Sequence, residues 1–321
     1  MRRVTLLATL LLVGCGSAHR PRPLAPSRRA PPRAPRTRLH VRIATRAVLP
    51  APLQLPAVAA RGGVTIAVGG LDAADRSLAT IERVTPGAPR VLGGLPQAIH
   101  DAGAAALRGT VYVFGGGTAA GPTDAIVAID RHGRARIAGR LPAPSSDLEA
   151  VRLGGEIVVV GGYTGAQPQR ALLGFTPGRS PRRIGSLPHP LRYAAAAAVG
   201  GRLVIAGGTD GVHARADVLS FDPRTGRTRR IARLPHPLAH AAGAAVRGSF
   251  LVLGGRGDGL ASQRRAIWAI DPASGRVWRA GALPRALSDL SAVALGSRIV
   301  VVGGRDRAGR VHRELLELAP R

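Results

Sequence analysis

The chain has 321 residues, of which 45% are apolar and only 3% aromatic. That length suits one large domain or two ordinary ones, with a core of aliphatic and small side chains. The formal charge is +28, and arginine makes up all 46 basic residues. Beyond residue 46, 35 arginines and 18 acidic residues are spread through the whole chain. We interpret the charge as a solvated basic surface and expect no nucleic-acid partner.

The first fifteen residues, MRRVTLLATLLLVGC, have the pattern of an export signal. Arg2 and Arg3 precede an apolar run over residues 4–13, which is too short for a membrane-spanning helix of about 20 residues. The run ends in Leu12-Val13-Gly14-Cys15, which resembles the lipobox of bacterial lipoproteins. That resemblance implies a signal peptide over residues 1–14, diacylation of Cys15, and an extracytoplasmic, lipid-anchored protein of the cell membrane.

Cys15 is the only cysteine, so the mature chain has no internal disulfide and no thiolate metal site. Residues 15–40 are rich in proline and arginine and poor in large apolar residues, so they cannot build a core. We expect them to form a semi-rigid, lipid-anchored tether. No later apolar stretch is long enough to span a bilayer, and two acyl chains suffice for stable attachment.

Two short motifs recur in step along the rest of the chain. Gly-Gly pairs that end an apolar run begin at Gly69, Gly115, Gly161, Gly207, Gly254 and Gly303. Leu-Pro pairs begin at Leu49, Leu95, Leu141, Leu187, Leu234 and Leu283. In all six units, the first glycine of the following pair lies 19 positions after the proline. Two marks in fixed register over six copies indicate a repeat architecture.

Each unit contains four strand-like pieces. A small-residue run follows Leu-Pro, and an apolar run such as EIVVV (156–160) then leads into Gly-Gly. A loop of variable length precedes an alternating piece such as ADVLSFD (216–222), and a short fourth piece leads to the next Leu-Pro. Four short strands per unit of about 40–50 residues predict a β-propeller with one blade per unit.

The two ends of the chain complement each other. The sixth unit ends at Arg321 after ELLELAP, which corresponds to a third strand, so its fourth strand is missing. Residues 41–49 (VRIATRAVL) precede the first Leu-Pro and resemble the fourth strands of other units. We therefore predict an all-β, six-bladed propeller over residues 41–321, with the last blade closed by the N-terminal strand.

Double glycine after an apolar strand and Leu-Pro before the next unit resemble the kelch repeat. Trp278 stands at the usual tryptophan position, whereas no unit has the usual tyrosine before the turn. The resemblance implies that the loops after Leu-Pro and after Gly-Gly open on one face, which commonly binds partners or substrates. A copper enzyme of the galactose-oxidase type is disfavoured because it needs a cysteine-linked tyrosine, and we expect no cofactor and no metal.

Alignment of the units on Leu-Pro places one residue of each unit, polar in five of the six, near the mouth of the central channel. The equivalent position holds Leu55, Asp101, Asp147, Tyr193, His240 and Asp289, and the position before it includes His100 and Arg192. Glu149 interrupts an otherwise small-residue position further in. The predicted ligand-binding residues at the mouth are His100, Asp101, Asp147, Glu149, Arg192, Tyr193, His240 and Asp289.

Three functions are compatible with these residues. The leading hypothesis is a monomeric, non-catalytic binding module for a protein or glycan partner of the cell envelope, because no complete catalytic constellation is present. The alternative is a carbohydrate-active enzyme of the sialic-acid mutarotase-like kelch type, since carboxylates beside histidine can support acid–base chemistry. A third is a structural or sensory lipoprotein that docks a membrane partner.

Overall fold

The computed structural model describes residues 38–321 apart from residue 86 and the side chain of residue 45. The predicted leader, Cys15 and all but the last three residues of the predicted tether lie outside the described residues. Arg38–Arg321 form one compact unit. Among the described residues no helix is long and apolar enough to cross a membrane.

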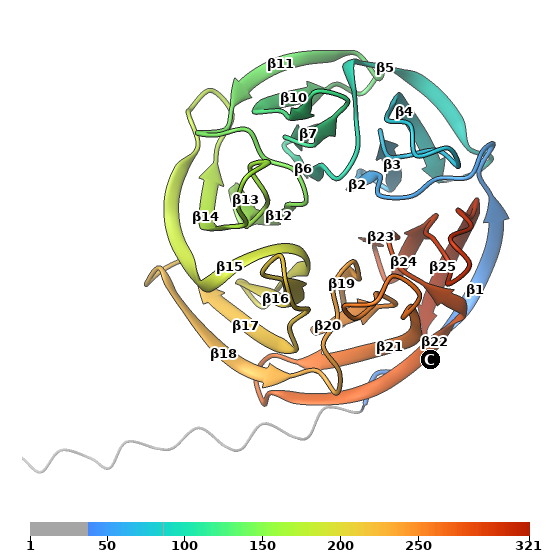
Figure 1. Ribbon diagram of the computed structural model, residues 1–321, viewed down its shortest axis with the longest axis vertical. Coiled ribbons are helices and arrows are strands. Elements are labelled where there is room, and N and C mark those ends of the chain that lie inside the picture. The colour runs from blue at the N-terminus through green and yellow to red at the C-terminus, as the bar shows by residue number, and fades with distance from the viewer. Residues whose placement is uncertain (1–37, 86) are drawn as a thin grey trace, which may run out of the picture. The chain divides into compact units, whose positions relative to one another are not determined.

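The strands fall into four positions, counted outward from the axis of the molecule (Figure 1). The innermost strands are β2 (Ala57–Arg61), β6 (Gly103–Leu107), β12 (Glu149–Leu153), the second half of β15 (Arg182–Val199), β19 (Ala242–Val246) and β23 (Ser291–Leu295). The second strands are β3 (Val64–Val68), β7 (Thr110–Phe114), β13 (Glu156–Val160), β16 (Arg202–Thr209), β20 (Ser249–Leu253) and β24 (Arg298–Val302).

The third strands are β4 (Leu78–Thr85), β10 (Ala125–Ile129), β14 (Gln169–Phe175), β17 (Asp217–Asp222), β21 (Arg264–Asp271) and β25 (Glu314–Pro320). The outermost strands are β5 (Arg90–Ile99), β11 (Ala135–Arg140), the first half of β15, β18 (Arg227–Arg233), β22 (Arg276–Leu287) and β1 (Val41–Val48). A small ribbon of β8 (Gly117–Thr118) and β9 (Gly121–Pro122) forms in one loop.

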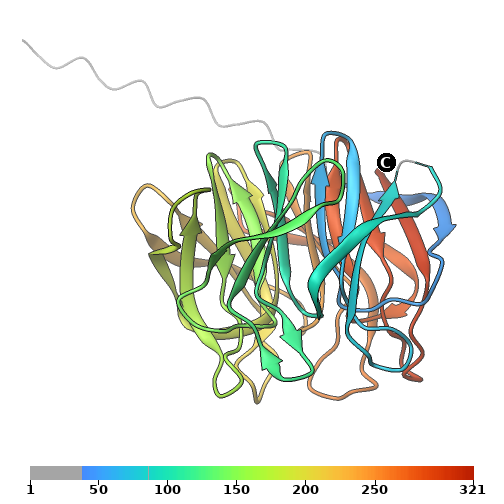
Figure 2. The same ribbon diagram turned by 90° about the horizontal axis from the view of Figure 1, so that it is seen from above.

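These strands form an all-β propeller. Four sheets have four strands each, and a seven-stranded sheet runs from β12 to β18. Within the larger sheet, the first part of β15 pairs with β14 and its last part pairs with β16. The sheets stand side by side around a central axis, and Figure 2 shows the ring that they form from its side. β5, β15 and β22 continue through their Leu-Pro pairs, which outermost strands tolerate because their free edge needs no donor there.

The core lies between neighbouring sheets. The second strands carry continuous apolar runs and are buried on both faces, as in Val111, Val113 and Ile157. Phe114 and Phe175 come from neighbouring repeats and meet edge to face with ring centroids 5.2 Å apart. The innermost strands are rich in alanine, since little space remains where the sheets converge on the axis.

The Gly-Gly pairs attach each repeat to the next one. The second glycine of every pair donates its N–H to a carbonyl in the following repeat, and the Gly304 N–H donates to Leu53 O at 2.9 Å. The first glycine packs so tightly against the same carbonyl that a Cβ on Gly303 would lie 2.0 Å from Leu53 O. Glycine is required here because the contact admits no side chain and the backbone has positive φ.

A second ring of hydrogen bonds surrounds the axis. The six residues aligned at the channel mouth all have φ between 53° and 59°. Each donates its backbone N–H to the carbonyl of its counterpart in the previous repeat, at 2.8–3.2 Å. The series returns to its start, because Asp289 O accepts from the N–H of Leu55 at 2.8 Å.

The N-terminal and C-terminal strands lie in one sheet. β1 pairs antiparallel with β25, from Val41 opposite Pro320 to Val48 opposite Glu314. The pairing has a register shift after Ile43, and each of the other five pairs of third and outermost strands also contains a register shift. Leu39 is buried nearby, and its carbonyl accepts a hydrogen bond from Trp278 Nε1 at 2.7 Å.

The Gly-Gly contact can be tested by comparing two glycines with nearly the same φ. Gly303 (φ 62°) faces Leu53 O, whereas Gly296 (φ 60°) has no atom within 4 Å of an added Cβ. Gly296→Ala should cost about 1–2 kcal/mol of unfolding free energy through backbone strain alone. Gly303→Ala should cost at least about 3 kcal/mol, because the carbonyl must also move. Equal losses in denaturant unfolding would contradict this role of the pair.

Candidate functional site

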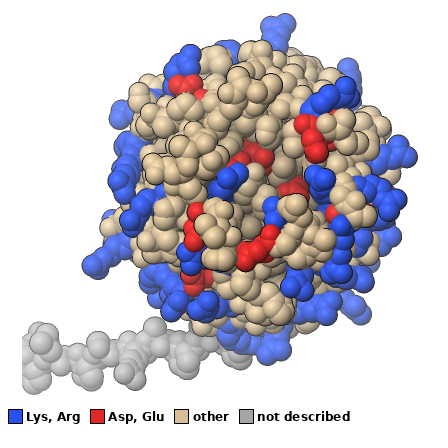
Figure 3. Space-filling view, viewed as in Figure 1, with Lys and Arg blue, Asp and Glu red and all other residues tan. Residues whose placement is uncertain are grey.

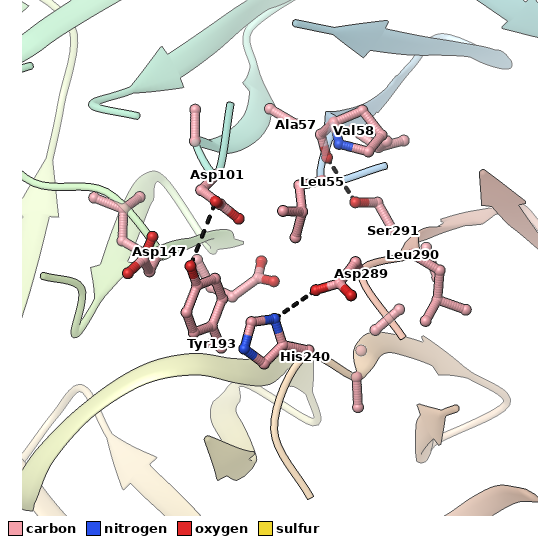
Figure 4. A pocket seen from close by; sticks show the side chains of 18 of the residues that line it. Leu55, Ala57, Val58, Asp101, Asp147, Tyr193, His240, Asp289, Leu290 and Ser291 are labelled. Atoms are coloured by element: carbon pink, nitrogen blue, oxygen red, sulfur yellow. Dashed lines mark hydrogen bonds and ion pairs between the residues drawn. The ribbon is translucent and has the colours of Figure 1, made fainter. Parts of the chain in front are cut away.

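The hydrogen-bonded ring places five polar side chains around the axis at one end of the molecule. Asp101, Asp147, Tyr193, His240 and Asp289 line a common cavity of about 70 Å³ (Figure 4). Leu55 is the sixth, apolar member of this ring. We call this end the mouth, and the face that carries it the mouth face. In Figure 3, acidic side chains gather near the middle of this face, and arginines surround them.

Asp147 is neutralised by an arginine from the next repeat. Its carboxylate forms an ion pair with Arg192 Nη2, and the two side chains are only 4% and 22% exposed. The Arg192 guanidinium lies 4.0 Å from the centre of the Tyr163 ring, a cation–π contact that fixes its orientation. Burial raises the pKa of Asp147 above its usual value, although the charge of Arg192 acts in the opposite direction.

Asp289 is held by hydrogen bonds to both of its oxygens. His240 Nδ1 lies 2.5 Å from Oδ1, and Ser288 Oγ donates to Oδ2 at 2.6 Å. Burial alone would raise the pKa of Asp289, but the bonds from His240 and Ser288 outweigh it and lower the pKa. Arg256 Nη2 lies 2.9 Å from His240 Nε2, and this network assigns the proton to Nδ1 and makes Nε2 an acceptor. His240 also stacks on Tyr193, with ring centres 3.6 Å apart.

Asp101 has no comparable partner. Its side chain is 6% exposed, Tyr193 Oη lies 3.5 Å from Oδ2, and His100 Nε2 lies 3.9 Å from the same oxygen. None of the described residues donates a hydrogen bond to Oδ1. Burial, together with the negative charges of Asp147 and Asp289, raises the pKa of Asp101 well above its usual value. Asp101 is therefore the aspartate of the hydrogen-bonded ring that still lacks a positively charged partner in contact.

Glu149 lies behind the mouth, where the cavity continues along the axis. It lines both the mouth and a second cavity of about 290 Å³, whose walls are mostly alanine side chains of the innermost strands. None of the described residues forms a hydrogen bond or ion pair with its carboxyl group. Burial raises the pKa of Glu149 to about 8, so this group is mostly protonated at neutral pH.

The structure brings six of the eight predicted site residues to the mouth cavity. His100 and Arg192 do not line it, although each reaches a carboxylate that does. His100 points toward the neighbouring loop, where its Nδ1 lies 2.9 Å from Ser77 Oγ. Tyr163 and Arg256 were not among the eight residues predicted at the mouth, but they belong to the loops after Gly-Gly, which the sequence also indicated as a source of contact residues. Both residues directly follow a Gly-Gly pair. Each forms an isolated β-bridge to the residue just before a ring position, so this shared place in the repeat is the sequence signal that indicates them.

The size and charge of the mouth limit its chemistry. The mouth cavity itself, of about 70 Å³, holds a few waters or one small polar group. A cavity of about 270 Å³ shares Tyr193 and His240 with it and is also lined by Arg192 and Arg256. Among residues 38–321, no group of three or more histidine, cysteine or acidic side chains is placed to hold a metal ion. His240 Nε2 already accepts a hydrogen bond from Arg256, so it is not free to act as a base. The mouth is therefore suited to a group that donates hydrogen bonds or carries positive charge.

Comparisons with known proteins agree with this architecture. Residues 190–234 match the Kelch motif family, which is the span of one repeat. No curated protein matches the chain by sequence. The solved structure of YjhT superimposes with a TM-score of 0.72 at 14% sequence identity, over 86% of this chain and 99% of that one. As many as 845 solved chains match, so the likeness defines a common fold and not a ligand. The chain is a β-propeller that carries the kelch motif.

Proposed function

We propose that this chain is a six-bladed, non-catalytic binding propeller of the bacterial cell envelope, lipid-anchored through Cys15. Its mouth accepts a cationic group of a protein or glycan partner. Asp101 carries the proposal, because it is a buried carboxyl group that faces the cavity without a charged partner in contact. A cationic hydrogen-bond donor in the cavity would give Asp101 the positive charge and the hydrogen bond that the protein itself does not provide.

The blade count follows from treating the seven-stranded sheet as two blades that share β15. The two rings of backbone hydrogen bonds each have six members and support this count. The pairing of β1 with β25 supports closure of the last blade by the N-terminal strand. A rigid closed ring presents its mouth residues in a fixed geometry, which lowers the entropy cost of binding.

The charge balance of the mouth favours a cation over an anion. Arg192 neutralises Asp147, and Arg256 donates to His240 of the His240–Asp289 pair, so both guanidinium groups already have polar partners within the protein. Tyr193 and His240 form a stacked pair at the cavity wall, beside which an organic cation could lie.

A carbohydrate-active enzyme of the mutarotase-like kelch type is the second candidate. The short contact between His240 and Asp289 favours it, since such pairs serve in acid–base catalysis. It ranks second because His240 Nε2 already accepts a hydrogen bond from Arg256 and is not free to act as a base. Turnover of an envelope sugar that is lost in Asp101→Asn or Asp289→Asn would reverse this order.

The cationic ligand can be identified by thermal unfolding of the protein with small probes. We expect arginine amide, alkylammonium ions or amino sugars to raise Tm, and neutral N-acetylated sugars to have no effect. A probe at 100 times its Kd stabilises by about 2.7 kcal/mol. Asp101→Asn should abolish the shift, whereas Asp75→Asn, an exposed carboxylate on the same face, should retain it.

The same experiment has a defined pH dependence. A cation binds the ionised form of Asp101, whose pKa is raised, so proton and ligand compete and affinity should increase as the pH rises. Affinity that is independent of pH, or a shift that survives in Asp101→Asn, would place the site elsewhere.

Glu149 predicts a second pH effect, on stability. Its pKa rises from 4.5 in the unfolded chain to about 8 in the fold, so the native state holds a proton that the unfolded state releases between these values. The stability of the native protein should therefore fall as the pH rises through this window. Glu149→Gln should match the native protein near pH 4.5 and exceed it near pH 9 by about 2 kcal/mol, less than the full pKa shift implies because water reaches the channel.

Chemical denaturation at both pH values measures this difference. Glu156→Gln is the control, because it removes a partly exposed ion pair with Arg182 and should have a small and similar effect at each pH. A Glu149→Gln variant without a gain at high pH would show that the carboxyl group is solvated.

The lipid anchor is tested at the only cysteine. Cys15→Ser should abolish metabolic labelling with palmitate and release the protein from the membrane fraction at high salt. Labelling that persists would contradict acylation at Cys15, since no other cysteine can take its place.

A further inference from the structure

The two ends of the propeller carry very different charge. Eleven turns between the described strands face away from the mouth, and we call the surface that they form the turn face. Each turn is taken from the last residue of one strand to the first residue of the next. These turns contain thirteen arginines and four carboxylates. The loops on the mouth face, including the bend of β15 at residues 187–193, contain eleven arginines and twelve carboxylates. The whole positive excess of the connecting segments thus lies on the turn face.

The positive charge of the turn face is available to a partner. Its exposed arginines that form no ion pair with any described residue include Arg90, Arg108, Arg134, Arg179, Arg227 and Arg247. Each of its four carboxylates is engaged locally. Glu156 pairs with Arg182, and Asp222 pairs with Arg202. Asp130 and Asp271 accept hydrogen bonds from backbone N–H groups of their own turns.

Arginines on the mouth face are mostly paired. Arg76, Arg140, Arg192, Arg215, Arg305 and Arg310 each form an ion pair with an aspartate of the same face. The two faces therefore differ in net charge and also in the share of their arginines that form no ion pair with a described residue.

The chain enters the propeller at the turn face. β1 begins with Val41 opposite Pro320, at the far end of the strand from the mouth, and the Arg321 N–H donates to His40 O at 2.7 Å. Between Cys15 and Arg38 lie 22 residues, which span at most about 80 Å when fully extended. A chain anchored at Cys15 thus holds the turn face within reach of the membrane at a high effective concentration.

We infer that the turn face docks on an anionic lipid surface. Basic residues near such a surface contribute about 1 kcal/mol each, and the attraction falls off within a Debye length of about 8 Å. The eleven turns have no exposed aromatic side chain on which a base could stack, which disfavours single-stranded nucleic acid. Docking in this orientation leaves the mouth open to the solvent on the opposite face.

The inference is tested by sedimentation with vesicles. The full chain carrying Cys15→Ser, which has no acyl group, is mixed with vesicles of zwitterionic lipid alone or with added anionic lipid. One variant combines Arg108→Asn, Arg227→Gln and Arg247→Asn on the turn face. Asparagine suits Arg108 and Arg247 because both have positive φ. The matched variant removes the same charge from the mouth face through Arg140→Gln, Arg264→Gln and Arg310→Gln. The leader is common to all variants, so differences among them report on the propeller.

We expect binding to anionic vesicles that weakens with salt, an approximately 100-fold loss in the turn-face variant, and little change in the mouth-face variant. Equal losses in the two variants would show a response to net charge and overturn the inference. Absence of binding to anionic vesicles would overturn it as well. So would tighter binding to double-stranded DNA than to vesicles at the same salt, with the same loss in the turn-face variant. Circular dichroism verifies that both variants are folded.

Discussion

The structure depends on a closed ring of backbone hydrogen bonds at the axis. In each repeat one residue adopts positive φ and donates its N–H to the equivalent carbonyl of the preceding repeat. A linear array would leave one donor and one acceptor unpaired at its ends, whereas the bond from Leu55 to Asp289 satisfies both. The Gly-Gly contacts repeat this closure further out, where Gly304 reaches Leu53. Neighbouring sheets are thereby held at a fixed separation, and the core packs between them.

This constraint also explains the chemical character of the mouth. Aspartate and histidine adopt the left-handed region more readily than most residues, so three aspartates and one histidine at ring positions satisfy a need of the backbone. Their side chains then converge on the axis. The backbone requirement does not explain why Asp101 is buried without a charged partner while Asp147 and Asp289 are compensated. This difference in charge compensation between Asp101 and the other two aspartates is the feature that points to a ligand.

The same topology separates two kinds of surface. Strands alternate in direction, so the connections at one end are loops that surround the mouth, and those at the other end are short turns. Ion pairs neutralise most arginines among the loops, whereas most arginines of the turns have no acidic neighbour. A propeller that faces anionic lipid with its turns and solvent with its mouth would combine anchoring and recognition without any moving part.

The sequence by itself determined the repeat, the all-β class and the register of the ring positions, because Gly-Gly and Leu-Pro mark sites where the backbone admits few alternatives. It also located most of the mouth residues, since alignment of the repeats superimposes residues that lie on one axis. It could not show that Arg192 forms an ion pair with Asp147, or that Arg256 forms a hydrogen bond with His240, because these contacts join loops of different length. It also suggested that the arginines were scattered. Only the tertiary structure decided which face carries the unpaired arginines, because alternate connections along the chain lie on opposite faces of a propeller. Charges that are mixed along the sequence therefore become separated in space.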